Sequence, residues 1–312
     1  MLIFAEKLPM NKTSRAHLFL IVSGLLFGAN YWIAKGLMPD FMQPAQIILV
    51  RCLSAVALFW LVSMMTIREK VGRRDHILLA MGGLTGISVN QTFFFSGLAL
   101  TSPVDAALLH SGSPIVVLLF SALIAGEKIN LLKISGILMG ASGAVALVLQ
   151  GSMAEGSSGN QLLGNSLIVL NIVSYSLYLV IIKPLMSRYT AITIMKWVFL
   201  YGFLFVIPYS LTSVSSIQFG NFTGFAWFSL TYIVLGTTFV TYLMTSYSLR
   251  YVSAGTAGYY IYIQPVIAAF IGIVLFRESF TLIKLLAAVL VFAGVFLVNR
   301  NTGSKKMSER NQ

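Results

Sequence analysis

Charged side chains inside long apolar stretches are the residues of this sequence best suited to chemistry. Lys35, Arg51 and Lys196 stand in such stretches, whereas the nearest acids stand at their ends. Ionisable groups within a hydrocarbon environment often mark a substrate path, and a base without an acid favours a carboxylate or another anion. Arg51 lies deepest, about 10 Å from the nearer end by helix rise. Bonding to carbonyl groups of a neighbouring helix is its simpler explanation, and the two lysines are shallow enough to reach an interface.

His110 is the only side chain within these stretches that titrates near neutral pH. It is therefore a candidate proton relay, and a hydrogen bond to a neighbouring helix is the simpler alternative. The adjacent Ser111 and Ser113 do not indicate a hydrolase, because that chemistry needs histidine and serine on separate elements in hydrogen-bonding geometry. We expect no enzyme activity.

Amide, hydroxyl and phenol groups recur within the apolar stretches at spacings of three or four residues, which place them on common helical faces. Hydroxyls in membranes commonly join one helix to another, and this explanation stays open for each of them. Together with the base and the histidine above, they form a set of candidates for a substrate pathway. The set comprises Asn30, Arg51, Asn90, Gln91, His110, Ser113, Asn171, Tyr175, Thr237, Tyr259, Tyr262 and Gln264.

Two prolines near the middle of apolar stretches, Pro114 and Pro265, predict helix breaks, because proline removes a backbone donor and frees the carbonyl four residues earlier. Broken helices at matching positions of two halves indicate a binding site near the membrane midplane. A packing kink without a ligand is the alternative for each proline singly. Their symmetry favours a role in shaping a cavity.

The elements that carry these residues are predicted to be membrane-spanning helices. The chain is 57% hydrophobic and 10% charged, whereas soluble domains devote about a quarter of their residues to charge. Continuous apolar runs of about 20 residues predict helices and not barrel strands. Ten segments qualify: 18–37, 44–67, 77–100, 103–125, 131–149, 162–182, 191–211, 225–249, 252–276 and 282–298.

The distribution of bases predicts the orientation of these spans. Sixteen of the 21 bases fall in the N-terminal segment 1–17, the C-terminal tail 300–312 and alternate loops, which places both termini in the cytoplasm. The outer loops then hold only Arg277 and Lys284. The net charge of +12 does not indicate nucleic-acid binding, because no basic helix is interleaved with aromatic residues. We also expect no metal and no cofactor, since neither a Cys or His cluster nor a phosphate-binding loop occurs.

An internal repeat organises the ten predicted spans. A shift of 151 residues superposes the fourth and fifth on the ninth and tenth without a gap, matching residue types that chance rarely aligns: Pro114 with Pro265, Glu127 with Glu278, Lys133 with Lys284 and Gly143 with Gly294. Five is an odd number of spans, so the second unit must enter the membrane upside down. We therefore expect two inverted five-helix repeats, 18–150 and 162–299, as in many secondary transporters.

The two copies of this pattern read SPIVVLLFSALIAGEKINLLKISGILMGASG and QPVIAAFIGIVLFRESFTLIKLLAAVLVFAG. The pattern resembles each half of EamA-like members of the drug/metabolite transporter superfamily. The resemblance implies ten helices, cytoplasmic termini, a central cavity and alternating access, often in exporters of amino acids or related metabolites. It says little about the substrate.

We therefore expect a multi-pass secondary transporter, in a bacterial inner membrane, that exports a small zwitterionic or anionic metabolite. Its partners would be that substrate, the lipid bilayer and a coupling proton or ion, because the chain has no nucleotide domain. A hydrophobic cation would normally need an embedded carboxylate. Export of drug-like compounds is the alternative within transporters, and a channel or receptor is the less favoured class. The sequence leaves the oligomeric state open.

Overall fold

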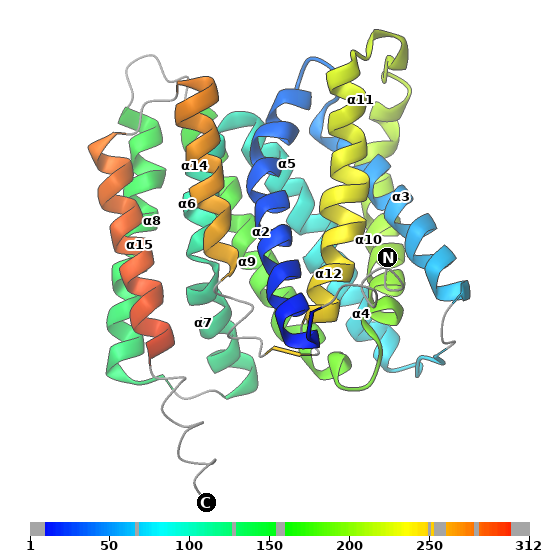
Figure 1. The fold of residues 1–312 in the computed structure, drawn as a ribbon, viewed down its shortest axis with the longest axis horizontal. Coiled ribbons are helices and arrows are strands. Elements are labelled where there is room, and N and C mark those ends of the chain that lie inside the picture. The colour runs from blue at the N-terminus through cyan, green and yellow to red at the C-terminus, as the bar shows by residue number, and fades with distance from the viewer. Residues whose placement is uncertain are drawn as a thin grey trace, which may run out of the picture.

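The computed structural model describes residues 10–65, 69–126, 129–153, 160–248, 251–252, 260–277 and 281–300, and these residues form helices and no strand (Figure 1). The α-helices are α2 (Lys12–Leu37), α3 (Pro44–Met65), α4 (Asp75–Gly83), α5 (Asn90–Leu100), α6 (Pro103–Ser111), α7 (Ser113–Ala125), α8 (Leu131–Met153), α9 (Asn160–Met186), α10 (Ala191–Val214), α11 (Gly224–Thr231), α12 (Thr241–Ser248), α14 (Ile263–Phe276) and α15 (Leu282–Arg300). Two π-helices, η1 (Leu84–Val89) and η3 (Tyr232–Val240), and two short 3₁₀ helices, η2 (Phe219–Asn221) and η4 (Tyr260–Tyr262), complete the set.

Each predicted span contains a helix, and apart from the start of the ninth span the ends lie within a few residues of those predicted. Among the described residues, eight helical segments are long and apolar enough to cross a membrane, and the apolar helices Tyr260–Phe276 and Leu282–Val298 are shorter. The chain is therefore a multi-pass membrane protein, and the total of ten crossings stays a prediction. Residues 253–259, in the first half of the ninth predicted span, lie outside the described residues.

Helix starts follow local side-chain capping. A side-chain oxygen of the residue before the helix accepts a backbone N–H of the first turn, which satisfies a donor that the helix itself leaves unpaired. Ser102 does so for α6, where Pro103 occupies the first turn and has no N–H to satisfy. The same cap is made by Asn11 for α2, Thr190 for α10 and Thr223 for α11.

The third and eighth predicted spans are continuous, but each contains a π-helix. In the first half α4 runs through η1 into α5, and in the second half α11 runs through η3 into α12. The wider turn of a π-helix leaves backbone carbonyls to which side-chain hydroxyls can donate. The Thr238 hydroxyl donates to the Ile233 carbonyl at 2.8 Å, and the Thr241 hydroxyl donates to the Gly236 carbonyl at 2.9 Å. The two distortions thus occupy corresponding places in the two halves. The sequence analysis did not predict them.

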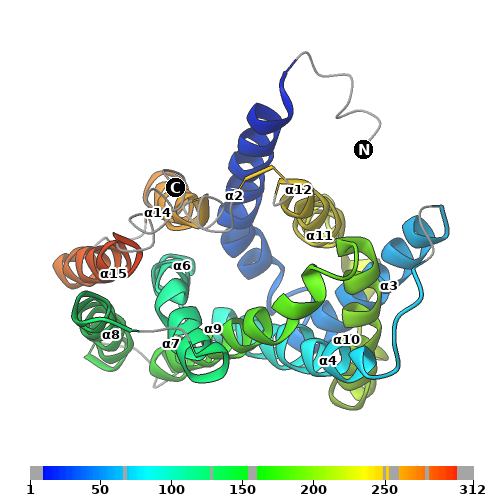
Figure 2. The ribbon, with the colours of Figure 1, turned by 90° about the horizontal axis from the view of Figure 1, so that it is seen from below.

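The two halves of the chain interlock through their first helices. Helix α2 of the first half packs against α12 and α14 of the second, while α9 of the second half packs against α5 and α7 of the first (Figure 2). The Ser248 hydroxyl donates to the Ala16 carbonyl at 2.9 Å, and the Trp32 indole N–H donates to the Ala268 carbonyl at 2.8 Å. Neither half therefore buries its helices on its own.

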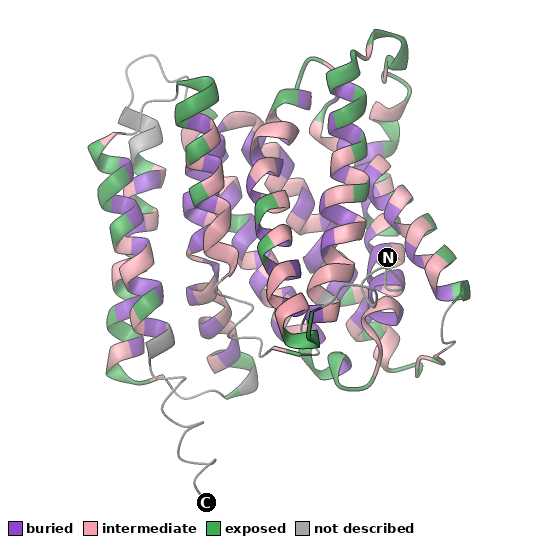
Figure 3. Cartoon of the chain, in the orientation of Figure 1, coloured by how far each residue is buried: buried purple, intermediate pink, exposed green. Residues whose placement is uncertain are grey.

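Helices α8 and α15 lie side by side at one edge of the bundle (Figure 2). Small residues allow their backbones to touch: a Cβ added to Gly294 would lie 2.5 Å from the Gly136 carbonyl oxygen and 2.6 Å from the Gly140 nitrogen. Small residues at such crossings are typical of membrane helices, where close van der Waals packing replaces hydrophobic burial. Exposed residues continue along the length of these helices (Figure 3), as expected for surfaces that face lipid.

Loops that the predicted topology places on the same side meet in the structure. Glu69, between α3 and α4, accepts hydrogen bonds from the Thr190 N–H at 2.9 Å and the Thr190 hydroxyl at 3.0 Å. Partial burial alone would raise the pKa of Glu69, but hydrogen bonds from Thr193 and Thr190 and the charge of Lys196 lower it below the usual value. Asp75 in the same region pairs with Arg188 at 3.1 Å. The carboxylate of Glu69 thus caps α10 from the other half of the chain.

Replacing Gly294 by Ala is expected to destabilise the protein by about 1–3 kcal/mol. The new methyl group would collide with backbone atoms of α8, which cannot move aside as a flexible side chain could. Thermal unfolding in detergent would measure this as a lower Tm. Gly220→Ala is the matched control, since a Cβ at Gly220 has no atom within 4 Å. Equal Tm values for the two variants would contradict the close approach of α8 and α15.

Candidate functional site

The fourth predicted span is broken beside Pro114, as expected. Helix α6 ends at Ser111 and α7 begins at Ser113, with Gly112 between them and Pro114 in the first turn of α7. The Gly112 N–H donates to the Leu109 carbonyl at 3.0 Å, which closes a tighter turn than an α-helix has. The break therefore falls two residues before the proline. Ser113 is buried there, at 6% exposure.

Pro265 occupies a corresponding place in the second half. It lies in the first turn of α14, which follows the short helix η4. A Cβ on Gly28 would lie 3.1 Å from the Gln264 carbonyl oxygen, so α2 packs closely against this turn. Tyr262 packs edge-on against Phe292 at 5.5 Å. Tyr259 lies outside the described residues, so its predicted place on the pathway stays untested.

Arg51 on α3 is buried, with 6% of its surface exposed. Its guanidinium carbon lies 5.7 Å from the centre of the Phe95 ring of α5. Among the described residues it has no hydrogen-bond or ion-pair partner, and its Nε is buried. The described helices therefore provide no carbonyl that Arg51 bonds, which was the simpler explanation of its position.

Lys35 is the base that bonds such carbonyls. Its ammonium group donates to the carbonyls of Leu98, Ala99 and Thr101 at 2.8, 2.7 and 3.0 Å. These groups lie at the C-terminal end of α5, where a cation also stabilises the helix dipole. The three N–H donors of the Lys35 ammonium group thus all have hydrogen-bond acceptors within the protein.

Lys196 also has partners within the protein, and only 8% of its surface is exposed. It donates to the Ser63 hydroxyl at 2.8 Å and lies 5.3 Å from the centre of the Trp60 ring and 6.0 Å from that of Trp197. Its position near an interface stays a prediction. Of the three predicted bases, Arg51 is the one for which the described residues provide no hydrogen-bond partner.

Two of the predicted amides join helices. The Asn90 amide donates to the Asn171 carbonyl at 3.2 Å, and the Asn171 amide donates to the Asn90 carbonyl at 2.8 Å. This reciprocal pair fastens α5 to α9. Gln91 differs, because its buried Oε1 has no partner among the described residues. The same is true of the Oδ1 of Asn171.

Asn30 and Thr237 meet each other, as the Thr237 hydroxyl lies 3.5 Å from the Asn30 Oδ1. The hydroxyl also donates to the Ile233 carbonyl at 2.9 Å within its own helix. The two residues connect α2 to η3. Their contacts fit the helix-joining explanation that the sequence left open.

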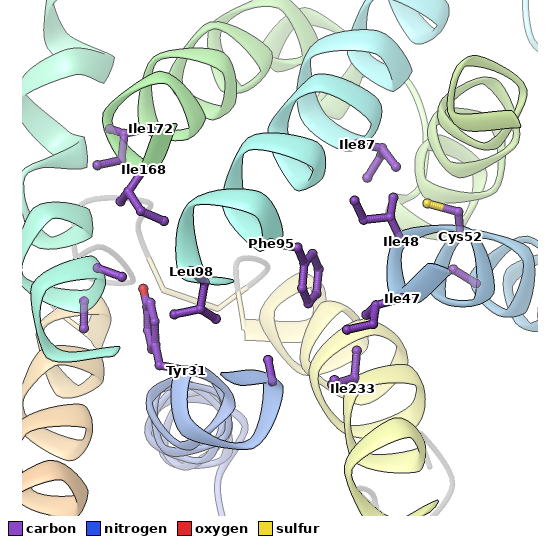
Figure 4. Close-up of a cluster of buried hydrophobic side chains, with 14 of the residues drawn as sticks. Tyr31, Ile47, Ile48, Cys52, Ile87, Phe95, Leu98, Ile168, Ile172 and Ile233 are labelled. Atoms are coloured by element: carbon purple, nitrogen blue, oxygen red, sulfur yellow. The ribbon is translucent and has the colours of Figure 1, made fainter. Parts of the chain in front are cut away.

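His110 sits between aromatic rings, with ring centres 6.0 Å from Tyr31 and 5.8 Å from Phe94. Its Nδ1 is buried and has no hydrogen-bond partner among the described residues. Figure 4 shows Tyr31 and Phe95 within the surrounding cluster of buried side chains, which several helices contribute. His110 is thus held by packing and not by a hydrogen bond to a neighbouring helix.

Tyr175 of α9 and Tyr242 of α12 are only partly buried, and neither hydroxyl makes a hydrogen bond to another described residue.

An ion pair that the sequence analysis missed joins the two halves. Asp105 of α6 lies 3.0 Å from the Lys284 ammonium of α15, and the two side chains are 2% and 7% exposed. Gln161 donates to the other carboxylate oxygen at 2.9 Å. Asp105 lies at a span end, as predicted, and Lys284, which was counted with the outer loops, lies in the first turn of α15, at the start of the predicted tenth span. The residue 151 positions after Asp105 is Thr256, so the second copy of the repeat has no acid at this position. The repeat therefore did not point to Asp105 as a residue that forms an ion pair.

The described residues thus form a multi-pass helical bundle with a buried base, Arg51, in its interior. A model of the EamA-like transporter family matches residues 14–149 and 162–300, so the chain belongs to that family. The resemblance in the sequence is therefore confirmed. The fold is shared with a solved crystal structure that is 18% identical, with a TM-score of 0.60 and coverage of 92% of this chain and 98% of that chain.

Relatives of the chain are transporters. It is 26% identical to the uncharacterized transporter YetK of Bacillus subtilis over 72% of this chain and 68% of that protein. It is 24% identical to a protein of Streptantibioticus cattleyicolor named as a probable terminal-alkyne amino-acid exporter, over 73% of this chain and 75% of that protein. The family and these relatives are transporters and not enzymes.

Replacing Asp105 by Asn is expected to destabilise the protein by about 3–5 kcal/mol, because it removes the carboxylate charge that lies 3.0 Å from the buried Lys284 ammonium. Combining it with Lys284→Met should recover most of that loss. Thermal unfolding in detergent is the measurement. Asp75→Asn is the control, since its partner Arg188 is 60% exposed and such pairs contribute about 0–1 kcal/mol. Equal effects of the two single substitutions would contradict the role of burial.

Proposed function

We propose that this protein exports a small metabolite bearing a carboxylate, either a zwitterion or an anion, by alternating access between its two halves. The observation that carries the proposal is Arg51: a buried guanidinium with no acid or carbonyl partner among the described residues. A planar guanidinium offers paired donors that match a carboxylate. A substrate carboxylate would therefore supply the hydrogen-bond partner that the described residues do not provide for Arg51.

The distribution of acids in the chain supports a substrate that carries a negatively charged group. The acids described within candidate spans are Asp75 and Asp105, both in first helical turns, and Arg188 and Lys284 pair with them. Glu127 and Glu278 lie outside the described residues. A hydrophobic cation would meet the buried base Arg51 in the interior and no unpaired carboxylate among the described spans. This favours a metabolite over a cationic drug.

The topology completes the proposal. Ten spans with both termini in the cytoplasm, in two inverted repeats 18–150 and 162–299, would let the halves rock about a central site. Contacts between loops 69–75 and 188–190 agree with the predicted alternation. The name of the Streptantibioticus relative supports an amino-acid-like substrate. We place the protein in a bacterial inner membrane, with an ion gradient or the substrate's own gradient as the energy source.

Replacing Arg51 by Gln is expected to lower counterflow in proteoliposomes about ten- to hundredfold at low substrate concentration, because a hydrogen bond to a charged group contributes about 1.5–3 kcal/mol. A pool of amino acids, organic acids and sugars would first identify the substrate.

Lys196→Gln is the matched control, since it also removes a buried base, but one that Ser63 and two indole rings already occupy. Unchanged counterflow in the Arg51 variant would refute its assigned role. Transport of hydrophobic cations alone would instead favour drug efflux, and flux without saturation would favour a channel.

His110→Gln is expected to leave the response of transport to a pH gradient intact. A relay needs hydrogen-bonded neighbours along which a proton moves, and the His110 Nδ1 has none among the described residues. A pH-sensitive dye inside proteoliposomes would follow proton movement while labelled substrate follows transport. Loss of proton movement with counterflow retained would show that His110 is the relay after all.

A further inference from the structure

Three helices of the bundle begin at a shared cluster of polar side chains. Asp105 lies in the first turn of α6, Gln161 in that of α9 and Lys284 in that of α15. One oxygen of the Asp105 carboxylate lies 3.0 Å from the Lys284 ammonium, and the other accepts the Gln161 amide N–H at 2.9 Å. Asp105 belongs to the first half of the chain, whereas Gln161 and Lys284 belong to the second. A single carboxylate therefore connects the two halves, at helix ends that the predicted topology places at the outer surface.

A second polar contact joins the halves beside this cluster. The Thr101 hydroxyl, at the end of α5, donates to the side-chain oxygen of Asn165 on α9, and the Asn165 amide donates to the Leu147 carbonyl of α8 at 2.9 Å. The backbones also approach closely here, because a Cβ added to Gly164 would lie 2.9 Å from the Thr101 nitrogen. Buried contacts thus connect the neighbouring ends of α5, α6, α8, α9 and α15.

Lys284 occupies a position that is unfavourable for a lysine by itself. The N-terminal turn of a helix carries a partial positive charge, which stabilises an acid such as Asp105 and destabilises a cation. The Lys284 side chain is also only 7% exposed, so water solvates its ammonium group little. The carboxylate of Asp105 offsets both costs. The ion pair therefore stabilises the arrangement in which the start of α6 stays against the start of α15.

The helix that carries Asp105 is short and separate from the next one. Helix α6 ends at Ser111, and Gly112 separates it from α7. Breaks at the ends of helices can absorb the change in backbone angles when one element tilts relative to the next. Helix α15, by contrast, is continuous and packs along α8. The element that can move away from this cluster is therefore α6, with Gly112 as its hinge.

The internal repeat provides this acid at one membrane surface only. A shift of 151 residues relates Lys284 to Lys133 in the first turn of α8, but it relates Asp105 to Thr256. Thr256 lies outside the described residues, and its side chain has no carboxylate. Because the predicted repeats are inverted, the related place belongs to the cytoplasmic surface. The sequence thus favours unequal contacts at the two surfaces.

We propose that Asp105, Gln161 and Lys284 form an outer latch. The latch holds the start of α6 against α9 and α15 while the carrier is open to the cytoplasm, and it separates when α6 tilts about Gly112 and the carrier opens outward. This inference rests on the proposed function and its topology, and it adds the contact that limits outward opening. An exporter has to open its outer surface to release substrate, whereas breaking a buried ion pair is costly.

The latch predicts opposite changes of apparent affinity at the two faces of the protein. Removing it raises the population of the outward-open state and lowers that of the inward-open state. The apparent affinity at each face follows the population of the state that binds there. A contact with a merely structural role would change the amount of folded protein, and hence the maximal rate, without moving the two affinities in opposite directions.

The experiment measures half-saturating concentrations in right-side-out and inside-out membrane vesicles, which present the outer and the inner face of the full-length protein. The probe is the compound with the strongest counterflow among the pooled amino acids, organic acids and sugars. In Asp105→Asn the value should fall at the outer face and rise at the inner face, so that their ratio falls about tenfold or more. Asp105→Asn combined with Lys284→Met should show the same fall with a higher Tm, which guards against a folding defect.

Asp75→Asn is the matched control, because it removes an ion pair that also joins the two halves but lies on the cytoplasmic side of the predicted topology, with Arg188 60% exposed. Its ratio should stay within about twofold of the unsubstituted value. An unchanged ratio in both Asp105 variants, or an equal fall in Asp75→Asn, would overturn the latch. Either result would leave the proposed function intact provided that Arg51→Gln still lowers counterflow. Counterflow of no compound would contradict the proposed function and the latch with it.

Discussion

The hydrocarbon environment supplies no hydrogen bonds, and this constraint shapes the whole bundle. Lys35 at a helix end, Lys196 beneath two indoles and Asp105 beside Lys284 are each neutralised or bonded within the protein. Against that background an unpaired Arg51 stands out. In the proposed function, a substrate carboxylate supplies the partner that the described residues do not provide.

The same constraint explains where the helices deviate from regular geometry. Gly112 interrupts the fourth span, and π-helices occur in the third and eighth. Such interruptions free backbone groups, which hydroxyls such as that of Thr241 then bond. They gather in the spans that surround the interlocked helices α2 and α9. Deviations in both halves are thus compatible with parts that move relative to one another, while α8 and α15 stay closely packed at the edge.

Much of the architecture followed from sequence patterns, because span length and composition report directly on the solvent around a helix. The break at Pro114 was predictable for the same local reason, as proline cannot donate within a helix. The partners of buried groups were not predictable. Asp105 and Lys284 lie 179 positions apart, and their contact depends on how α6 meets α15. Asn90 and Asn171 were candidates for a cavity, yet their amides mainly join two helices.

The sequence by itself therefore determined the class of protein, the positions of the helices and the family, since apolar length and the repeated proline, glutamate and lysine pattern are local properties of the chain. It also singled out Arg51 as a base without an acid. Only the tertiary structure decided which bases were satisfied, because a hydrogen bond depends on atoms brought together from distant helices. The contacts of the folded chain thus separate Arg51 from Lys35 and Lys196, although all three are bases within apolar stretches of the sequence.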